Sequence, residues 1–439
     1  MPATILIIDA GARGHAISCA YETSRNVGRI IVAPGNDFIS SNRTKEVLVE
    51  KACAVHDPAS ILEVAKKYNP DIIDVAQDNA LALGTTDLLR KNGFRVFGPT
   101  QLASRIESDK KWSKEFMIRH GIPTARFAHF SSENEAIDYV STIYTRSPNT
   151  YIFIKAAGLC GGKGALMANS IEDAVSCIYA MKSFGSAGKT FLIEEGLQGE
   201  EFSCYAISDG NSYRIFKSAQ DHKKSHDHDT GDQTGGMGAI SPAQVTDHFA
   251  SQIEETMIAP ALRGMKSEQV PFEGILYLGG IIADGKPYVI EYNARWGDPE
   301  CQVVLPSVTT DYFELVNAVI EKRLHEVRLE QDNKRRLCIV GSLRGYPHEF
   351  SSARGSRIFG LDAAINIEHV RLFGAGIICN NGQFLADGGR VLNVVGEGAT
   401  IVEARSRAYS AISQIFIEGN KMHYRTDIGW NDLERFYAI

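Results

Sequence analysis

The chain has 439 residues, of which 44% are hydrophobic and 23% charged, and 40 are glycines. This length exceeds one ordinary hydrophobic core, so we expect two to four globular domains. The net charge of −7 excludes a general affinity for nucleic acid or anionic membranes, although local basic sites for phosphate stay open.

The cysteines and the N-terminus indicate the compartment. The eight cysteines lie far apart and form no Cys-x-x-Cys pair, which favours free thiols in a reducing compartment over a disulfide framework or a zinc site. The first residues lack the basic region of a signal peptide, and no stretch approaches the roughly 18 apolar residues of a membrane helix. We therefore expect a cytoplasmic protein without membrane or nucleic-acid partners.

Strand and helix patterns alternate along residues 1–105, as in a parallel sheet with crossover helices. Strands are expected at 4–9, 29–33, 71–76 and 94–97, and helices at 15–21, 58–68 and 80–91. The first strand runs into a turn that contains Gly11 and Arg13 just before a helix. Backbone N–H groups and the helix dipole at such a place predict a site for a phosphate or ribose phosphate. A turn required only for close packing is the alternative, and the pattern is not that of a dinucleotide site.

A glycine-rich loop follows a strand expected at residues 151–155. The strand ends at Lys155, and the loop contains Gly161, Gly162, Lys163 and Gly164. Glycines let the backbone approach a ligand and lysines supply positive charge, so we predict a loop that covers phosphates. A flexible hairpin with incidental lysines is the alternative, and the order of glycines and lysine is not that of a Walker A motif.

A helix is expected earlier in the chain, over residues 106–120. A solvated basic face is the default interpretation of its lysines, Lys110, Lys111 and Lys114.

Polar residues gather in two further segments. Glu194, Glu195 and Glu201 could accept hydrogen bonds from an adenine amino group and a ribose hydroxyl, but their spacing alone favours surface carboxylates. The segment 220–238 is the most polar of the chain, and its three histidines, His222, His226 and His228, suggest a metal site. Since no fixed element sets their spacing, we expect this loop to contact a polar substrate instead.

A strand expected at residues 287–293 leads into Glu291, Asn293 and Arg295. Alternate residues of a strand share a face, so these side chains should project together. Two oxygen ligands and a guanidinium suit a phosphate chain with Mg²⁺, whereas an exposed edge strand is the alternative. A helix expected at 246–265 precedes this strand. Beyond a helix at 312–324 and a charged linker, a small α+β unit is expected, with strands at 337–343, 370–379 and 390–395 and helices at 400–417 and 430–436.

Taken together, these segments resemble the glycinamide ribonucleotide synthetase (phosphoribosylamine–glycine ligase) family of the ATP-grasp superfamily over essentially the whole chain. The motifs that carry the resemblance are APGN (33–36), FGPT (97–100), IKAAGLCGGKG (154–164), IEEGLQGEE (193–201), VIEYNARWGDPE (289–300) and RTDIGW (425–430). The resemblance implies an ATP-grasp fold in a multidomain α/β and α+β chain. It also implies that the chain divides into three domains: a Rossmann-like parallel α/β domain (1–105), an ATP-grasp domain (106–328) with a lid at about 124–194, and a C-terminal α+β domain (329–439).

The resemblance also implies the reaction: ATP-dependent ligation of phosphoribosylamine and glycine through glycyl phosphate, in purine biosynthesis, by a monomer or weak homodimer. It assigns ATP binding to Lys110, Lys155, Gly161, Gly162, Lys163, Gly164, Glu194, Glu195, Leu197 and Glu201. It assigns Mg²⁺ or Mn²⁺ to Glu291 and Asn293, and catalysis to Arg295 and Lys155. It assigns substrate binding to Gly11, Arg13, Asp78, Asp221, Lys223, Arg295 and Asp298.

The chain departs from the family pattern in the loops expected to hold the amine. Gly14 stands where the family has glutamate, and residues 76–81 read AQDNAL in place of GPEAPL, which shifts a carboxylate to Asp78. These changes leave open a paralogue that joins another amino acid to another amine. A non-catalytic nucleotide-binding protein is a further alternative.

Overall fold

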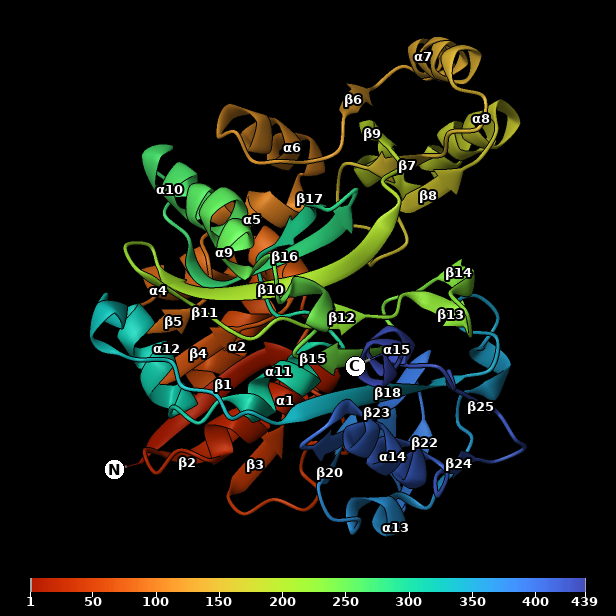
Figure 1. Cartoon of the computed structure of the whole chain (residues 1–439). Coiled ribbons are helices and arrows are strands. Elements are labelled where there is room, and N and C mark those ends of the chain that lie inside the picture. Colours follow the sequence, from red (N-terminus) through yellow and green to blue (C-terminus); the bar gives the residue numbers. More distant parts are fainter. Residues whose placement is uncertain (1, 439) are drawn as a thin grey trace.

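The computed structural model describes residues 2–438 (Figure 1). Its N-terminal part is a parallel sheet in the order β3-β2-β1-β4-β5, as the alternating pattern predicts. The strands are β1 (Ala3–Asp9), β2 (Val27–Pro34), β3 (Glu46–Val49), β4 (Ile72–Val75) and β5 (Val96–Phe97). Helices cover both faces, so successive residues of β1 enter two different hydrophobic cores, Ile5 and Ile7 in one and Leu6 and Ile8 in the other.

Two of the helices predicted in this part are each divided into two, whereas the helix predicted at 58–68 has the expected bounds. The helices are α1 (Ala12–Glu22), α2 (Pro58–Tyr68), α3 (Asp78–Ala82), α4 (Thr85–Lys91), α5 (Gln101–Ser108) and α6 (Lys110–Arg119). The single helix expected at 80–91 is wrong, because Gly84 adopts a φ of 79° between α3 and α4. The helix expected at 106–120 is likewise two helices: Asp109 separates them, and its carboxylate accepts from Trp112 N at 3.0 Å to begin α6.

An antiparallel sheet in the order β11-β10-β16-β17 lies at the centre of the molecule (Figure 1). Its strands are β11 (Tyr213–Ile215), β10 (Gly199–Asp209), β16 (Glu273–Ala283) and β17 (Lys286–Asn293). The predicted helix at 246–265 consists of α9 (Ala250–Ile253), a π-helical turn (Glu254–Ile258) and α10 (Ala259–Ser267). Met257 and Leu262 from this segment share a hydrophobic core with Leu278 and Tyr292 of the sheet.

A smaller antiparallel sheet projects at the upper right of Figure 1 and has its own hydrophobic core. We call this unit the lid sheet. Its strands, in the order β6-β9-β7-β8, are β6 (Phe127–Phe130), β9 (Phe191–Glu195), β7 (Ile152–Ala156) and β8 (Ala165–Ala168). Two helices, α7 (Glu133–Arg146) and α8 (Ile171–Ala180), pack on it.

The C-terminal sheet contains strands from two separate parts of the chain. Its order is β12-β15-β18-β23-β20, with β25 paired to β18. The strands are β12 (Gln220–Asp221), β15 (Gly238–Ser241), β18 (Arg335–Leu343), β23 (Arg390–Gly398), β20 (Val370–Gly374) and β25 (Met422–His423). Because β12 and β15 come from the polar segment, this sheet reaches across the boundary expected at residue 328.

The remaining elements complete this half of the molecule. They are α11 (Cys301–Val304), α12 (Tyr312–Ile320), α13 (Leu361–Ile365), α14 (Ile401–Ile412), α15 (Trp430–Tyr437), β13 (Lys224–His226), β14 (Thr230–Gln233), β19 (Ile358–Phe359), β21 (Ile377–Asn380), β22 (Gln383–Ala386) and β24 (Phe416–Ile417). The strand expected at 370–379 is therefore two strands of different sheets, and the helix expected at 400–417 ends at Ile412. Within residues 2–438, no helix has both the length and the apolar composition needed to span a membrane.

Candidate active site

One cavity of about 1100 Å³ collects the predicted site residues. It is lined by the lid sheet, β17, the turns after β1 and β4, and loops of the C-terminal sheet. Every predicted residue except Lys163 lines it; Lys163 is exposed in the loop 157–164. Residues from positions 9 to 390 thus meet in one place, which no single motif could predict.

Strand β17 presents Glu291 and Asn293 to the cavity by simple alternation, and Arg295 follows in the next turn. Arg295 Nη2 lies 2.7 Å from Glu107 Oε1 and 3.4 Å from Asn293 Oδ1. The other oxygen of Glu107 accepts from Ala294 N at 2.8 Å, so one buried carboxylate fixes both the guanidinium and the backbone beside it. Sequence reasoning missed Glu107, which lies 188 positions before Arg295.

The charges around β17 keep Glu291 ionised. Burial raises the pKa of Glu291, but the positive charges of Lys223, Lys110 and Lys155, with Arg295, outweigh burial and lower that pKa to about 2. Carboxylate and amide oxygens on one face are ligands that a hard cation prefers. The Nε of Arg295 is buried without a hydrogen-bond partner among the described residues, so its guanidinium retains a donor.

A buried ion-pair cluster links the lid sheet to α6. Lys155 Nζ donates to Glu194 Oε2 at 2.7 Å, and Lys114 Nζ lies 3.0 Å from the same oxygen. Burial raises the pKa of Glu194, but Lys114 and Lys155 outweigh it and lower that pKa. The interpretation of Lys114 as part of a solvated face is wrong, since this residue is 2% exposed. Glu194 Oε1 is buried with no partner among residues 2–438 and can accept a hydrogen bond from a ligand.

The loop between β7 and β8 fits close approach to a ligand. Gly161 and Gly162 adopt φ values of 57° and 79°, a region that favours glycine, and both line the cavity with Gly164. Leu197 and Glu195 line the same end, and the Glu195 side chain is 44% exposed.

The opposite wall carries a second set of charges. Lys223 Nζ lies 3.2 Å from Glu201 Oε2, and this carboxylate raises the pKa of Lys223 well above its usual value. Burial, and then the charge of Glu300, raise the pKa of Asp221 well above its usual range. Asp221 Oδ1 is buried without a partner among the described residues, which leaves it able to meet a polar substrate group.

The anion site predicted at the start of α1 is filled by the protein itself. Asp9 Oδ1 accepts from Gly11 N at 2.7 Å and from Gly14 N at 3.0 Å, while Asp298 Oδ2 accepts from Arg13 N at 3.3 Å. Arg13 is also bound to Asp9, with Nε 2.7 Å from Oδ2. A phosphate at this position would displace two carboxylates, so that prediction is wrong. The sequence held a sign of this, because Asp9 is a carboxylate only two residues before Gly11 and five before Gly14, near enough to accept from their N–H groups.

Asp78 remains beside this cluster, as expected. Burial raises the pKa of Asp78, but Arg295 and Arg13 outweigh burial and lower it. The carboxylate is therefore ionised at the wall formed by the turns after β1 and β4.

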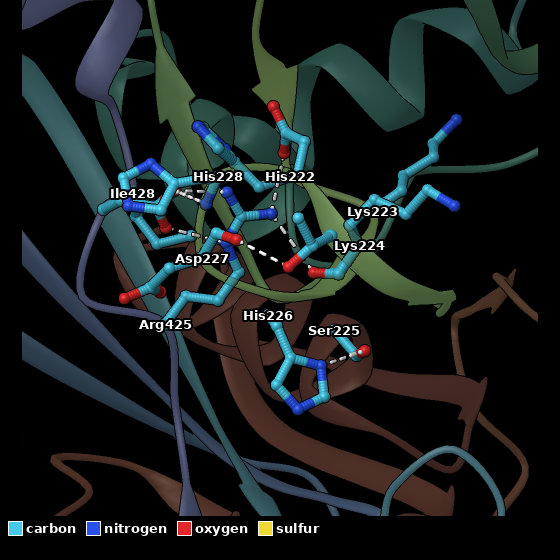
Figure 2. A network of polar contacts seen from close by, with 12 residues as sticks. His222, Lys223, Lys224, Ser225, His226, Asp227, His228, Arg425 and Ile428 are labelled. Carbon is cyan, nitrogen blue, oxygen red and sulfur yellow. Dashed lines mark hydrogen bonds and ion pairs between the residues drawn. The ribbon is translucent and has the colours of Figure 1, made fainter.

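The histidines of the polar segment have separate partners (Figure 2). His222 Nε2 accepts from Gly429 N at 3.1 Å, His226 Nδ1 lies 2.7 Å from Ser225 Oγ, and the backbone N of His228 donates to Asp427 at 2.7 Å. Among residues 2–438, no group of three or more His, Cys, Asp or Glu could hold a metal ion. Instead, Arg425 anchors the segment to the C-terminal part of the chain.

Three family models match the chain: the N domain of phosphoribosylglycinamide synthetase over residues 3–107, its ATP-grasp (A) domain over 108–301 and its C domain over 336–431. A phosphoribosylamine–glycine ligase from Brucella melitensis is 37% identical over 435 residues, 98% of each chain, and one from Vibrio vulnificus is 38% identical over 98% of this chain and 99% of that protein. The crystal structure of the phosphoribosylamine–glycine ligase from Thermotoga maritima has a TM-score of 0.78 at 30% identity, covering 97% of this chain and 99% of that one. The chain belongs to the phosphoribosylglycinamide synthetase family and has its ATP-grasp fold.

Proposed function

We propose that this protein is an ATP-dependent ligase that joins phosphoribosylamine and glycine into glycinamide ribonucleotide, a step of purine biosynthesis, with release of ADP and phosphate. The observation that carries the proposal is the cavity that a lysine–glutamate pair on the lid sheet shares with two oxygen ligands on β17 and the guanidinium of Arg295 in the following turn. Relatives that match this chain over its full length bear the name of that activity.

The lid end of the cavity binds ATP in this proposal. Lys110 and Lys155 neutralise phosphate oxygens, while the loop with Gly161, Gly162, Lys163 and Gly164 closes over them. The free Oε1 of Glu194 accepts from the adenine amino group, a role that its lack of a protein partner supports. Glu195, Leu197 and Glu201 line the remainder of the nucleotide site.

Glu291 and Asn293 hold Mg²⁺, or Mn²⁺ in its place. Mg²⁺ is typically held by one or two protein oxygens together with substrate phosphates, and the ionised Glu291 beside an amide oxygen fits that pattern. When bound, the cation supplies charge neutralisation to the phosphate chain.

Arg295 and Lys155 are the catalytic residues of the proposal. Arg295, fixed by Glu107, braces the phosphoryl group as it passes to the glycine carboxylate, and positioning with charge stabilisation supplies most of the rate in such transfers. The amine then displaces phosphate from glycyl phosphate. Asp221, Lys223 and Asp298, with Gly11, Arg13 and Asp78, surround these two substrates.

The direct test measures ADP release by the purified chain with Mg²⁺, ATP, glycine and freshly formed phosphoribosylamine. We expect turnover that requires both amine and amino acid. Turnover with a different pair alone would refute this substrate assignment. Measurable ATP binding without ADP formation for any amine would identify a non-catalytic protein.

Glu291→Ala tests the metal assignment. Loss of one charge-stabilising group should lower ADP release by about 10²–10³-fold, with an unchanged thermal unfolding midpoint. Glu63→Ala is the matched control, since the Glu63 side chain is 72% exposed on α2. Near-normal turnover of Glu291→Ala would contradict the assignment.

We also propose a cytoplasmic location and a division into domains at about residues 105 and 328, with the lid at 124–194. All eight cysteines are unpaired, which suits a reducing compartment. The parallel sheet ends at Phe97, and the core of the lid sheet runs from Ala136 to Ile193, which supports the first boundary and the lid range.

A further inference from the structure

The amine substrate of the proposed reaction carries a phosphate, and the start of α1 cannot receive it. Asp9 and Asp298 already occupy the N–H groups of Gly11, Arg13 and Gly14. Asp9 is 1% exposed, and a Cβ at position 14 would lie 2.9 Å from its Oδ1. The phosphate must therefore find its positive charge elsewhere in the cavity.

Most other cations on this side of the cavity are paired with carboxylates. Arg13 is bound to Asp9, Arg295 to Glu107 and Lys223 to Glu201. Lys110 and Lys155 belong to the lid end: Lys155 is bound to Glu194, and both are assigned to the phosphates of ATP in the proposed function. Among the described residues that line the cavity, the remaining cation is Arg390, and its ion pair with Asp298 uses Nη1 alone.

Arg390, at the start of β23, is held by only one of its nitrogens. Nη1 donates to Gly235 O at 2.7 Å and to Asp298 O at 2.8 Å, and it lies 3.3 Å from Asp298 Oδ1. Among the residues that the structure describes, nothing accepts from Nη2 or Nε. The side chain is 23% exposed and lines the cavity, so these two donors are available to a ligand.

A second donor converges on the same place. Tyr346 Oη accepts from Gly235 N at 3.2 Å, which leaves its own O–H free to donate. A Cβ on Gly235 would lie 3.4 Å from both Tyr346 Oη and Arg390 Nη2, so the hydroxyl and the guanidinium flank one point. Gly376 and Gly388 form the adjoining wall, where a Cβ on Gly376 would lie 2.4 Å from Gly388 Cα. Within residues 2–438, no carboxylate accepts from these donors, whereas a phosphate monoester could accept from both.

We propose that Arg390 and Tyr346 form the subsite for the phosphate of the amine substrate, a ribosyl 5-phosphate. This inference rests on the proposed function for the identity of the substrate. Asp298 positions the guanidinium by binding Nη1, and Gly235 brings the tyrosine hydroxyl beside it.

The test is the dependence of ADP release on amine concentration in Arg390→Met and Tyr346→Phe. Loss of a charge-assisted bond should raise KM for phosphoribosylamine about 10- to 100-fold in Arg390→Met, and less in Tyr346→Phe, while KM for glycine and ATP stays within about twofold. Arg371→Met is the control, since Arg371 is exposed on β20 of the same sheet and outside the cavity. An unchanged KM for the amine in both variants, or an equal rise in KM for glycine, would overturn the subsite.

Calorimetric binding of ribose 5-phosphate separates this inference from the proposed function. We expect binding to the wild-type chain, loss in Arg390→Met and retention in Arg371→Met, whether or not the chain turns over. Equal binding by wild type and both folded variants, Arg390→Met and Tyr346→Phe, would refute the phosphate subsite. Absence of turnover with phosphoribosylamine and glycine, with ribose 5-phosphate binding intact, would refute the reaction instead.

Discussion

Lys114 and Lys111 lie three positions apart on α6 and have opposite environments. Lys114 is 2% exposed and shares the carboxylate of Glu194 with Lys155. The Lys111 side chain, in contrast, is 39% exposed, and its Nζ comes no closer than 4.0 Å to Glu115 Oε1. Lys114→Met should lower the free energy of unfolding by about 1.5–3 kcal/mol, the value of a hydrogen bond to a charged group. Lys111→Met should change it by less than about 0.5 kcal/mol. Thermal unfolding of the two variants measures these changes. Equal changes would contradict the prediction that the buried ion pairs of Lys114 stabilise the fold more than the exposed pair of Lys111.

At the residue scale, sequence reasoning succeeded where chemistry follows local spacing. Alternation along β17 placed Glu291 and Asn293 on one face without any tertiary information. It failed for Glu107, because the partner of Glu107, Arg295, lies 188 positions away and is brought to it by the fold. It overlooked Asp9, although the partners of Asp9 at Gly11, Arg13 and Gly14 are local in sequence. A lysine in a basic run gives no sign of which neighbour is buried, so Lys114 could not be distinguished from Lys111.

At the scale of elements, Arg425 holds the β13–β14 hairpin against the C-terminal segment (Figure 2). Its side chain is 0% exposed; Nη1 donates to Lys224 O at 3.1 Å and to Asp229 Oδ1 at 2.8 Å, and Nη2 donates to Asp427 Oδ2 at 2.8 Å. The polar composition of 220–238 predicted a substrate loop but not this anchor, whose bonds join residues about 200 positions apart. The histidines were misleading because His222 and the backbone of His228 bond to Gly429 and Asp427 of the same C-terminal segment, whereas the ring of His226 is bonded to Ser225.

Arg425→Met should free the hairpin and expose the bonds after Lys223 and Lys224 to trypsin. We expect these sites to be cut at least about tenfold faster, since the lost charge-assisted bonds raise the population of the opened hairpin. Arg328→Met is the control, because Arg328 is 88% exposed. Mass spectrometry of the early fragments identifies the cut, and unchanged cleavage between 223 and 225 would contradict the anchoring role.

At the scale of the whole molecule, sequence reasoning predicted the classes of the sheets but not their membership. The N-terminal parallel sheet is local in sequence, since all its strands lie within residues 3–97. The C-terminal sheet instead pairs Gly238–Ser241 with β18, about a hundred residues later. Hydrophobic patterns report which face of a strand is buried, and they carry no information on which strand lies beside it.

Helix α1 contacts β20 of the C-terminal sheet through His15, whose Nδ1 accepts from Gly374 N at 3.0 Å. Burial, with the charge of Arg43, lowers the pKa of His15 from 6.5 to about 3. In the same part of the chain, burial raises the pKa of Asp74 to about 7, although Tyr21 donates to it at 2.9 Å. Burial therefore moves the pKa values of these two groups in opposite directions.

Their effects on stability with pH are consequently opposed. His15 stabilises the fold fully above pH 6.5, and this contribution is lost as the pH falls toward 3, because only the unfolded state takes up the proton. Asp74 stabilises the fold at low pH, where its carboxyl group is protonated. This contribution is lost as the pH rises from 3.8, the usual pKa of the group, through 7. Between pH 7 and pH 5 each changes the free energy of unfolding by about 2 kcal/mol, with opposite sign.

Two asparagine variants separate these contributions. In His15→Asn the amide oxygen can still accept from Gly374 N, so its unfolding midpoint relative to wild type should rise as the pH is lowered from 7 to 5. In Asp74→Asn the unfolding midpoint relative to wild type should fall as the pH is lowered from 7 to 5, because the variant lacks the proton uptake that stabilises the wild-type fold. Loss of the ring contacts with Phe38 and Phe373 lowers the unfolding midpoint of His15→Asn equally at both pH values, so it does not change how that midpoint varies with pH. Parallel pH profiles for the two variants and wild type would show that folding shifts the pKa of neither group.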